Sequence, residues 1–263
     1  MQRNYLKFKT DNEQIRLLQN TWHSVYQNSY AEGLKFLIKG LNLPIHNIGD
    51  VLDKIEKKIP IQYILKKWSF YEGEYFINEN VLIPRPETEI LVDYVTSKFK
   101  DKKNILDLGT GSGCIAVELS KKLQTAKITG VDISAKAIEL AKKNNSQTEN
   151  HVNFFTSNWF SNVNQKYDLI VSNPPYIAKS LNLDESVSFE PLIALYSENQ
   201  GLADLSKIIT YSINYLQMNG VLMLEHGIGQ ENYLQEKMIK EGFKKIELIK
   251  DLKDINRFII GHR

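Results

Sequence analysis

Four consecutive residues combine an amide, two prolines and an aromatic ring: Asn173-Pro174-Pro175-Tyr176. Proline fixes its own φ, lacks an N–H and pushes the residue before it into extended geometry. The backbone here is therefore stiff, and the Asn173 side-chain oxygen and the Pro174 carbonyl are left as hydrogen-bond acceptors that no sheet neighbour needs. Two fixed acceptors beside an aromatic ring suit a planar substrate that carries an NH₂ group. A proline-rich turn that merely stops a strand would explain the same residues, so their surroundings have to decide.

A second candidate site is a glycine-rich loop that follows an apolar run ending near Asp107. Three glycines stand at alternate positions, separated by a threonine and a serine: Gly109, Thr110, Gly111, Ser112 and Gly113. Glycines let the backbone turn sharply and approach a ligand, and a following helix presents free N–H groups. A phosphate-binding P-loop would need a Gly-Lys-Ser/Thr sequence, which is absent. The spacing fits a dinucleotide fingerprint and, better, an S-adenosylmethionine loop with an acidic residue at the strand end.

The ends of the next two apolar runs also carry polar or aromatic side chains. Asp132 follows Gly111 by about 20 residues, where a carboxylate can accept hydrogen bonds from both ribose hydroxyls of a nucleotide-like ligand. A local turn or helix cap is the alternative for Asp132. Asn158 could accept a hydrogen bond from an adenine amino group, and Trp159 could stack on a ligand or simply pack in the core.

Two further segments, one around Pro86 and one at Glu225-His226, could serve either the fold or the function. Pro86 fits the first turn of a helix, and the acidic residues around it suit the helix N-terminus. The alternative is a lip over the ligand site, in which Arg85 or Glu89 touches the ligand. Glu225 and His226 end a later apolar run. They could form an acid–base pair, or His226 could merely cap a loop.

All these residues require a scaffold that brings strand ends together. Seven strands are predicted at 104–108, 127–132, 152–156, 167–172, 220–225, 244–249 and 257–261, and helices at about 113–123, 134–144, 204–218 and 230–241. This alternation predicts an α/β fold with a mostly parallel sheet, whose ligands lie beyond the carboxyl ends of the strands. Before it, residues 1–67 predict a small helical bundle and residues 68–83 a linking β-hairpin, which leaves residues 84–263 as the catalytic domain.

The composition narrows the function classes. The chain of 263 residues has a net charge of only +2, whereas a protein that holds a long stretch of nucleic acid usually carries a stronger basic surplus. Its single cysteine, Cys114, excludes an internal disulfide, and no zinc-binding pattern is present. Since no apolar run could span a membrane and the N-terminus lacks an apolar signal core, a cytoplasmic protein is expected.

Taken together, these residues resemble the PrmC (HemK) family, the protein-(glutamine-N5) methyltransferases that act on peptide chain release factors. The resemblance runs along the whole chain and includes, besides the glycine loop and the Asn-Pro-Pro-Tyr run, the segment Ile83-Pro84-Arg85-Pro86-Glu87-Thr88-Glu89 and the run Glu225-His226-Gly227. Three positions depart from the family pattern: Asn158, Gln200 and Asp254.

The resemblance implies a Rossmann-like, S-adenosylmethionine-dependent enzyme that methylates the glutamine of a Gly-Gly-Gln motif. S-adenosylmethionine would contact residues 109–113, Asp132, Trp159 and Asn173, and residues 173–176 would bind the glutamine amide. Asn173, Pro174 and Tyr176 would be the catalytic residues. Residues 1–67 would recognise the release factor, with the enzyme a monomer that needs no metal, no membrane and no stable nucleic-acid partner.

Two related activities remain open at this point. A glutamine methyltransferase for a ribosomal protein would use the same chemistry, although the segment 83–89 argues against it. An N6-adenine nucleic-acid methyltransferase would flip its target base and stack it on the aromatic ring. That enzyme would normally need a target-reading region and a basic channel, whereas the insert 178–203 is short and carries several acidic residues.

Overall fold

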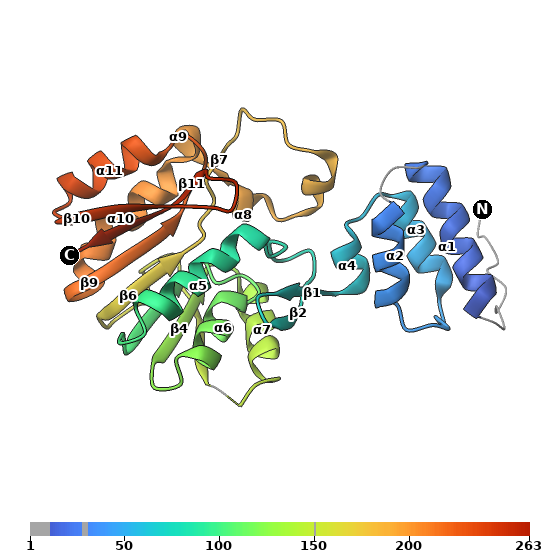
Figure 1. Cartoon of the computed structure of the whole chain (residues 1–263), viewed down its shortest axis with the longest axis horizontal. Helices are drawn as coiled ribbons and strands as arrows, with labels where there is room; N and C mark the ends of the chain where they lie inside the picture. The colour runs from blue at the N-terminus through green and yellow to red at the C-terminus, as the bar shows by residue number, and fades with distance from the viewer. Residues whose placement is uncertain (1–10, 28–30, 150) are drawn as a thin grey trace. The chain divides into compact units, whose positions relative to one another are not determined.

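A computed structural model describes residues 11–27, 31–149 and 151–263 and divides the chain into two compact units (Figure 1). One unit comprises Met1–Lys67 together with Asp184–Phe189. The other comprises Trp68–Leu183 and Glu190–Arg263. No helix in the described part of the chain is both long enough and apolar enough to cross a bilayer.

The first unit is built from short amphipathic helices: α1 (Asp11–Tyr26), α2 (Ala31–Gly40), α3 (Ile48–Glu56) and α4 (Ile61–Leu65). Apolar residues at helical spacing pack into one core, which includes Leu18, Trp22, Leu37, Val51, Leu52 and Ile55. Gln14 is buried inside this unit and makes two hydrogen bonds to the backbone of Ile45, one to its N–H (2.7 Å) and one to its carbonyl (2.9 Å). The loop after α2 is thereby tied to α1.

The second unit contains the predicted mostly parallel seven-stranded sheet, which is confirmed. Its strand order is β10-β11-β9-β6-β3-β4-β5. The strands are β3 (Asn104–Leu108), β4 (Lys127–Asp132), β5 (Val152–Thr156), β6 (Tyr167–Ser172), β9 (Leu216–Glu225), β10 (Lys245–Lys250) and β11 (Asn256–His262). Strands β5, β4, β3, β6 and β9 run parallel, and β11 and β10 complete the sheet as antiparallel neighbours.

Helices cover both faces of this sheet, as Figure 1 shows. Helices α5 (Glu89–Lys98), α6 (Cys114–Lys122) and α7 (Ala135–Asn145) contribute to one apolar cluster, and α10 (Ala203–Tyr215) and α11 (Glu231–Lys240) contribute to the other. Strands buried on both faces read as nearly continuous apolar runs, which is why β3, β4 and β6 follow from the sequence, whereas the edge strand β5 alternates buried and exposed residues.

Three predicted elements have clearly different limits in the structure. The strand expected over 220–225 begins four residues earlier, at Leu216. The helix expected over 204–218 ends at Tyr215, because Leu216 pairs with Tyr167 and starts β9. The hairpin expected over 68–83 consists only of β1 (Lys67–Phe70) and β2 (Gly73–Phe76). After Phe76 the Asn78 side chain accepts a hydrogen bond from the N–H of Asn80 (3.0 Å), an Asx turn that stops the ladder.

The remaining elements of the second unit are short and lie near the carboxyl ends of the central strands. They are η1 (Pro86–Thr88), β7 (Ile177–Ala178), α8 (Leu192–Leu195), β8 (Tyr196–Ser197) and α9 (Glu198–Gly201). A further short helix, η2 (Glu185–Phe189), belongs to the first unit. The chain leaves β3 toward β4 and β5 and then returns to place β6 on the other side of β3. This reversal lies between β3 and β6, so it brings the glycine loop and the Asn-Pro-Pro-Tyr run to one edge of the sheet.

Candidate active site

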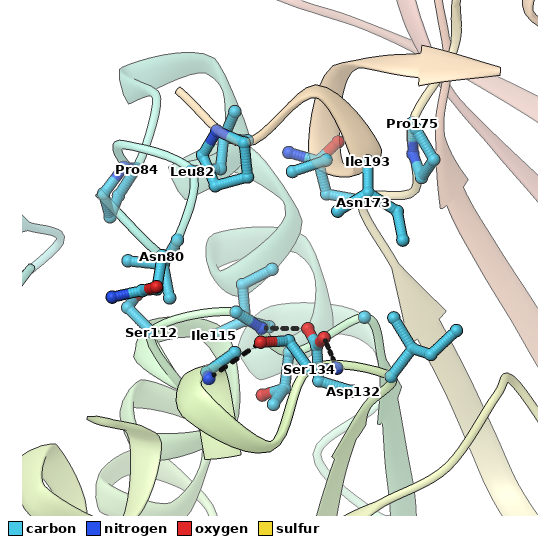
Figure 2. A pocket seen from close by; sticks show the side chains of 18 of the residues that line it. Asn80, Leu82, Pro84, Ser112, Ile115, Asp132, Ser134, Asn173, Pro175 and Ile193 are labelled. Atoms are coloured by element: carbon cyan, nitrogen blue, oxygen red, sulfur yellow. Dashed lines mark hydrogen bonds between the residues drawn. The ribbon is translucent and has the colours of Figure 1, made fainter. Parts of the chain in front are cut away.

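A cavity of about 360 Å³ lies at this edge (Figure 2). Its walls come from the loop after β2, the glycine loop, the ends of β4, β5 and β6, and α8; they include Leu82, Thr110, Asp132, Trp159, Asn173 and Ile193. Sites for small-molecule ligands typically measure roughly 300–1,000 Å³. The cavity is thus large enough for a cofactor-sized ligand, and it joins two sequence motifs that are more than 60 positions apart.

The glycine loop adopts a backbone that only glycine accepts easily. Gly111 and Gly113 have φ angles of 55° and 82°. A Cβ on Gly113 would lie 2.9 Å from the Cβ of Ala141 in α7, so the loop also packs closely on its neighbouring helix. The N–H groups of Gly109 and Thr110 both donate to the carbonyl of Val131 at the end of β4, at 2.8 and 2.9 Å. The loop is therefore held rigidly over the sheet edge.

Asp132 links the end of β4 to this loop, as Figure 2 shows. One carboxylate oxygen accepts from the N–H of Gly111 and the other from the N–H of Ser134, both at 2.9 Å. Ser134 then caps α7 by accepting from the N–H of Ala137 (3.2 Å). Asp132 therefore makes the local turn that the sequence allowed. An ionised carboxylate has about four acceptor positions, so its two oxygens can still accept ligand hydroxyls at the cavity wall.

Asp107 lies fully buried beneath the glycine loop. Its Oδ2 accepts from the hydroxyl of Thr110 (2.6 Å), whereas no described residue is hydrogen-bonded to its buried Oδ1. Burial raises the pKa of Asp107 to about 7. A buried acceptor without a partner favours a ligand that brings positive charge to the loop.

Trp159 stands at the end of β5 with its ring against the glycine loop. A Cβ on Gly109 would lie 3.4 Å from the Trp159 ring. The indole Nε1 donates to Asp204 Oδ1 (3.1 Å), and Asp204 Oδ2 accepts from the hydroxyl of Ser197 (2.6 Å). Trp159 therefore both packs against the apolar cluster and lines the cavity in a fixed orientation. The neighbouring Asn158 lines the cavity as well, with an exposed side chain.

Asn173 lies directly after β6, and its amide has a defined direction. Its Nδ2 donates to the hydroxyl oxygen of Thr88 (3.0 Å). The Thr88 hydroxyl donates in turn to Glu225 Oε2 (2.7 Å), and the Tyr176 hydroxyl donates to Glu225 Oε1 (2.9 Å). Because the amide nitrogen faces Thr88, Oδ1 is turned away from Thr88, and no described residue donates to it. The cavity wall includes Asn173 and Pro175, whereas Pro174 is buried.

Glu225 and His226 are both buried at the end of β9. Burial raises the pKa of Glu225, and the hydrogen bonds from Thr88 and Tyr176 act in the opposite direction. Burial lowers the pKa of His226, whose Nδ1 is 2.8 Å from the carbonyl of Gly227. Glu225 is thus a buried acceptor for two hydroxyl groups around the Asn-Pro-Pro-Tyr run.

Sequence reasoning missed the residues that brace the walls of the cavity. Glu190 accepts from the N–H of Ile83 (2.9 Å) and from the guanidinium of Arg85 (2.5 Å), which holds the loop before η1. Arg85 lines the cavity, as the sequence allowed. Glu89 accepts instead from the N–H of Tyr71 (3.0 Å) in the hairpin turn. These pairings join distant segments, so no local pattern could have indicated them.

Asn144 is a second brace of this kind. Its side chain accepts from the N–H of Phe76 (2.7 Å) and donates to the carbonyls of Phe76 (2.9 Å) and Ser112 (2.8 Å). The amide therefore acts as a strand partner for the end of β2 and fixes the glycine loop at the same time. Asn144 is 1% exposed and lies in the last turn of α7, and the sequence has no local sign of its distant partners.

The mostly parallel sheet and the cavity over a glycine loop at its carboxyl edge are Rossmann-like, and comparison with known proteins assigns this fold to the methyltransferases. A family model described as "Methyltransferase small domain" matches residues 86–193. The fold is similar to the crystal structure of a methyltransferase from Pyrococcus furiosus, with a TM-score of 0.56 and 18% identity, covering 72% of this chain and 87% of that chain.

Curated relatives narrow the class to one family. The chain is 41% identical to the release factor glutamine methyltransferase of Buchnera aphidicola subsp. Acyrthosiphon pisum, over 78% of this chain and 75% of the relative. It is 38% identical to the release factor glutamine methyltransferase of Haemophilus influenzae, over 80% of this chain and 78% of the relative. The chain belongs to the release factor glutamine methyltransferase family, which confirms the resemblance drawn from the motifs.

Proposed function

We propose that this protein transfers the methyl group of S-adenosylmethionine to the side-chain nitrogen (N5) of the glutamine in the Gly-Gly-Gln motif of peptide chain release factors. The observation that carries the proposal is the direction of the Asn173 amide. Its nitrogen is committed to Thr88, so its oxygen is the atom left for a ligand at the cavity wall. An acceptor fixed in this way suits the NH₂ group of a carboxamide.

The residues at the cavity fit the cofactor. The glycine loop of residues 109–113 offers a close backbone approach, and Asp132 offers carboxylate oxygens for ribose hydroxyls. The unpaired buried Oδ1 of Asp107 favours a cationic ligand, and S-adenosylmethionine carries both a sulfonium and an ammonium group. We assign the adenine end to the wall formed by Trp159. When bound, S-adenosylmethionine supplies an electrophilic methyl group for transfer to the amide nitrogen.

Positioning is the main contribution of the protein to this reaction. An amide nitrogen is a poor nucleophile, because its lone pair is delocalised into the carbonyl. We assign one N–H of the glutamine to Asn173 Oδ1 and the other to the Pro174 carbonyl, which fixes the amide plane and aims the nitrogen at the methyl carbon. Well-oriented reactants can lower a barrier by roughly 7–11 kcal/mol.

Tyr176 and Pro175 complete the amide site in this proposal. Tyr176 is anchored through its hydroxyl to Glu225, and its carbonyl accepts from the Gln230 amide (3.0 Å), so the run has fixed contacts at its end. We propose that the ring bounds the plane of the glutamine amide. The methylated nitrogen is acidic and releases a proton to water, so no dedicated base is required.

The replacement Asn173→Ala tests the acceptor role. We expect kcat to fall by about 10²–10³, the usual effect of removing one preorganised polar group from a reacting centre. The Kd for S-adenosylmethionine, measured by calorimetry, should change little, because the glycine loop and Asp132 remain. Asn153→Ala on the exposed side of β5 is the matched control. A near-wild-type rate for Asn173→Ala would show that the acceptor role is wrong.

A single labelling experiment tests the substrate. The protein is mixed with methyl-labelled S-adenosylmethionine, release factors, ribosomal proteins and DNA, and the labelled molecule and atom are identified. Label on the glutamine nitrogen of a release factor is expected; label on a ribosomal protein or on adenine would refute the proposal. We further propose that the helical unit recognises the release factor, and that the enzyme acts in the cytoplasm as a monomer without a stable nucleic-acid partner.

A further inference from the structure

We infer that Thr88 and Glu225 are positioning residues of this reaction, because together they determine which end of the Asn173 amide faces the substrate. The inference rests on the proposed acceptor role of Asn173. It also assigns a purpose to Thr88, to which the sequence analysis gave no individual role. Neither residue needs to touch the substrate for this effect.

The need for such a device follows from the shape of the asparagine side chain. Its carbonyl and NH₂ groups are nearly equal in size, so packing alone hardly distinguishes the two orientations of the amide. With the nitrogen turned inward, Asn173 would present donors to a substrate NH₂ group, and the hydrogen bond that orients the nucleophile would be lost. Only a neighbouring hydrogen-bonding group can select the productive orientation.

In the structure, successive hydrogen bonds run from Asn173 to Thr88 and from Thr88 to Glu225, each donated toward Glu225. Glu225 is 1% exposed, and both of its oxygens accept from hydroxyl groups, Oε2 from Thr88 and Oε1 from Tyr176, so neither acts as a donor here. Its Oε2 takes the single hydroxyl proton of Thr88 (2.7 Å). Thr88 Oγ1 has then no proton left, so toward Asn173 it can only accept, and it does so from Nδ2 (3.0 Å). Because Glu225 accepts from Thr88, Thr88 can only accept from Asn173. The Asn173 nitrogen therefore faces Thr88, and Oδ1 is left for the substrate.

The positions of these groups argue for a role beyond holding the fold. They come from η1, β6 and β9, and Thr88 and Glu225 are only 3% and 1% exposed, which limits the access of water that could offer these two groups alternative donors. Burying a carboxylate is costly unless it is hydrogen-bonded. Apolar residues could hold the same three segments together, whereas they could not orient an amide.

Three variants test the inference: Thr88→Val, which removes the hydroxyl at nearly constant volume; Thr88→Ser, which keeps it; and Glu225→Gln. Release factor methylation gives kcat and KM, and calorimetry gives the Kd for S-adenosylmethionine. We expect Thr88→Val to lower kcat by at least about tenfold, equivalent to about 1.4 kcal/mol, with KM and Kd within about twofold. Thr88→Ser should restore kcat to near the wild-type value.

Thr129, in β4, is also a buried threonine, so Thr129→Val is the matched control for the stability cost of losing a buried hydroxyl. Equal losses of kcat in Thr88→Val and Thr88→Ser would mean that packing matters and the hydroxyl does not, which overturns the inference. A wild-type kcat for Thr88→Val beside an inactive Asn173→Ala would overturn it too, while leaving the proposed function intact. An active Asn173→Ala would instead refute the proposed acceptor role itself.

Glu225→Gln keeps the inference testable if Thr88→Val does not fold. The glutamine NH₂ group can donate to Thr88, which frees the threonine proton for the oxygen of Asn173 and allows the unproductive orientation. We expect kcat to fall at least threefold with KM within about twofold. An unchanged kcat in folded Glu225→Gln protein would show that the direction of the Asn173 amide does not depend on Glu225.

Discussion

Gly201 stands where a left-handed turn presses against the backbone of the Asn-Pro-Pro-Tyr run. Its φ is 85°, and the two residues before it also have positive φ angles. A Cβ on Gly201 would lie 2.1 Å from the carbonyl oxygen of Tyr176 and 2.8 Å from the side-chain nitrogen of Gln230. That nitrogen donates to the same Tyr176 oxygen (3.0 Å). Gly201→Ala should therefore displace the segment that carries Asn173.

The size of the effect follows from three contributions. The left-handed backbone costs a residue with a side chain roughly 1–2 kcal/mol. Overpacking against backbone atoms costs roughly 1–3 kcal/mol. The lower entropy of the unfolded alanine chain offsets roughly 0.4–1 kcal/mol. We expect the free energy of unfolding to fall by roughly 1–5 kcal/mol. The value of kcat should fall more than the affinity for S-adenosylmethionine, because the glycine loop lies on a different strand end.

Gly229→Ala is the matched control. Gly229 has nearly the same φ, 81°, but a Cβ there would have no neighbour within 4 Å, so the variant carries the backbone cost without the collision. Urea unfolding gives the stability of both variants, and methylation of a release factor gives kcat. If both variants lost equal stability and Gly201→Ala kept the wild-type kcat, the contact with Tyr176 would not position the active site.

Two further predictions concern the glycine loop. Burial raises the pKa of Asp107 from 3.8 to about 7, so the folded state holds this proton more tightly and loses stability as the pH rises through that range. Between pH 5 and pH 8 the free energy of unfolding should fall by roughly 2–3 kcal/mol more in the wild type than in Asp107→Asn, measured by urea titration; equal pH slopes would contradict this. Asn144→Ala should remove the three hydrogen bonds that this side chain makes to the backbone of Phe76 and Ser112 and cost roughly 2–4 kcal/mol of stability. It should also weaken S-adenosylmethionine binding several-fold in calorimetry, and an unchanged Kd would show that the loop does not depend on this brace.

Local sequence patterns were sufficient for much of the scaffold. Strand β6 could be placed because the apolar run Leu169-Ile170-Val171 is soon followed by an asparagine and two prolines, which end regular pairing. Pairing partners can override such patterns, as the end of α10 shows. Leu216 continues the helical apolar spacing, yet it pairs with Tyr167, and the helix stops one residue earlier. The sequence contains no local sign of that partner.

The chemistry of the site, like the scaffold, was determined partly by the sequence and partly by the tertiary structure. The residue types and their positions at strand ends, such as Asn173, Asp132 and the glycines of residues 109–113, follow from the sequence by itself, because they depend on neighbours along the chain. The direction of the Asn173 amide was decided only by the tertiary structure. It depends on Thr88, 85 positions away in the sequence, which is itself bonded to Glu225 across 137 positions. Hydrogen bonds act over about 3 Å in space whatever the separation along the chain, so folding alone brings these groups together.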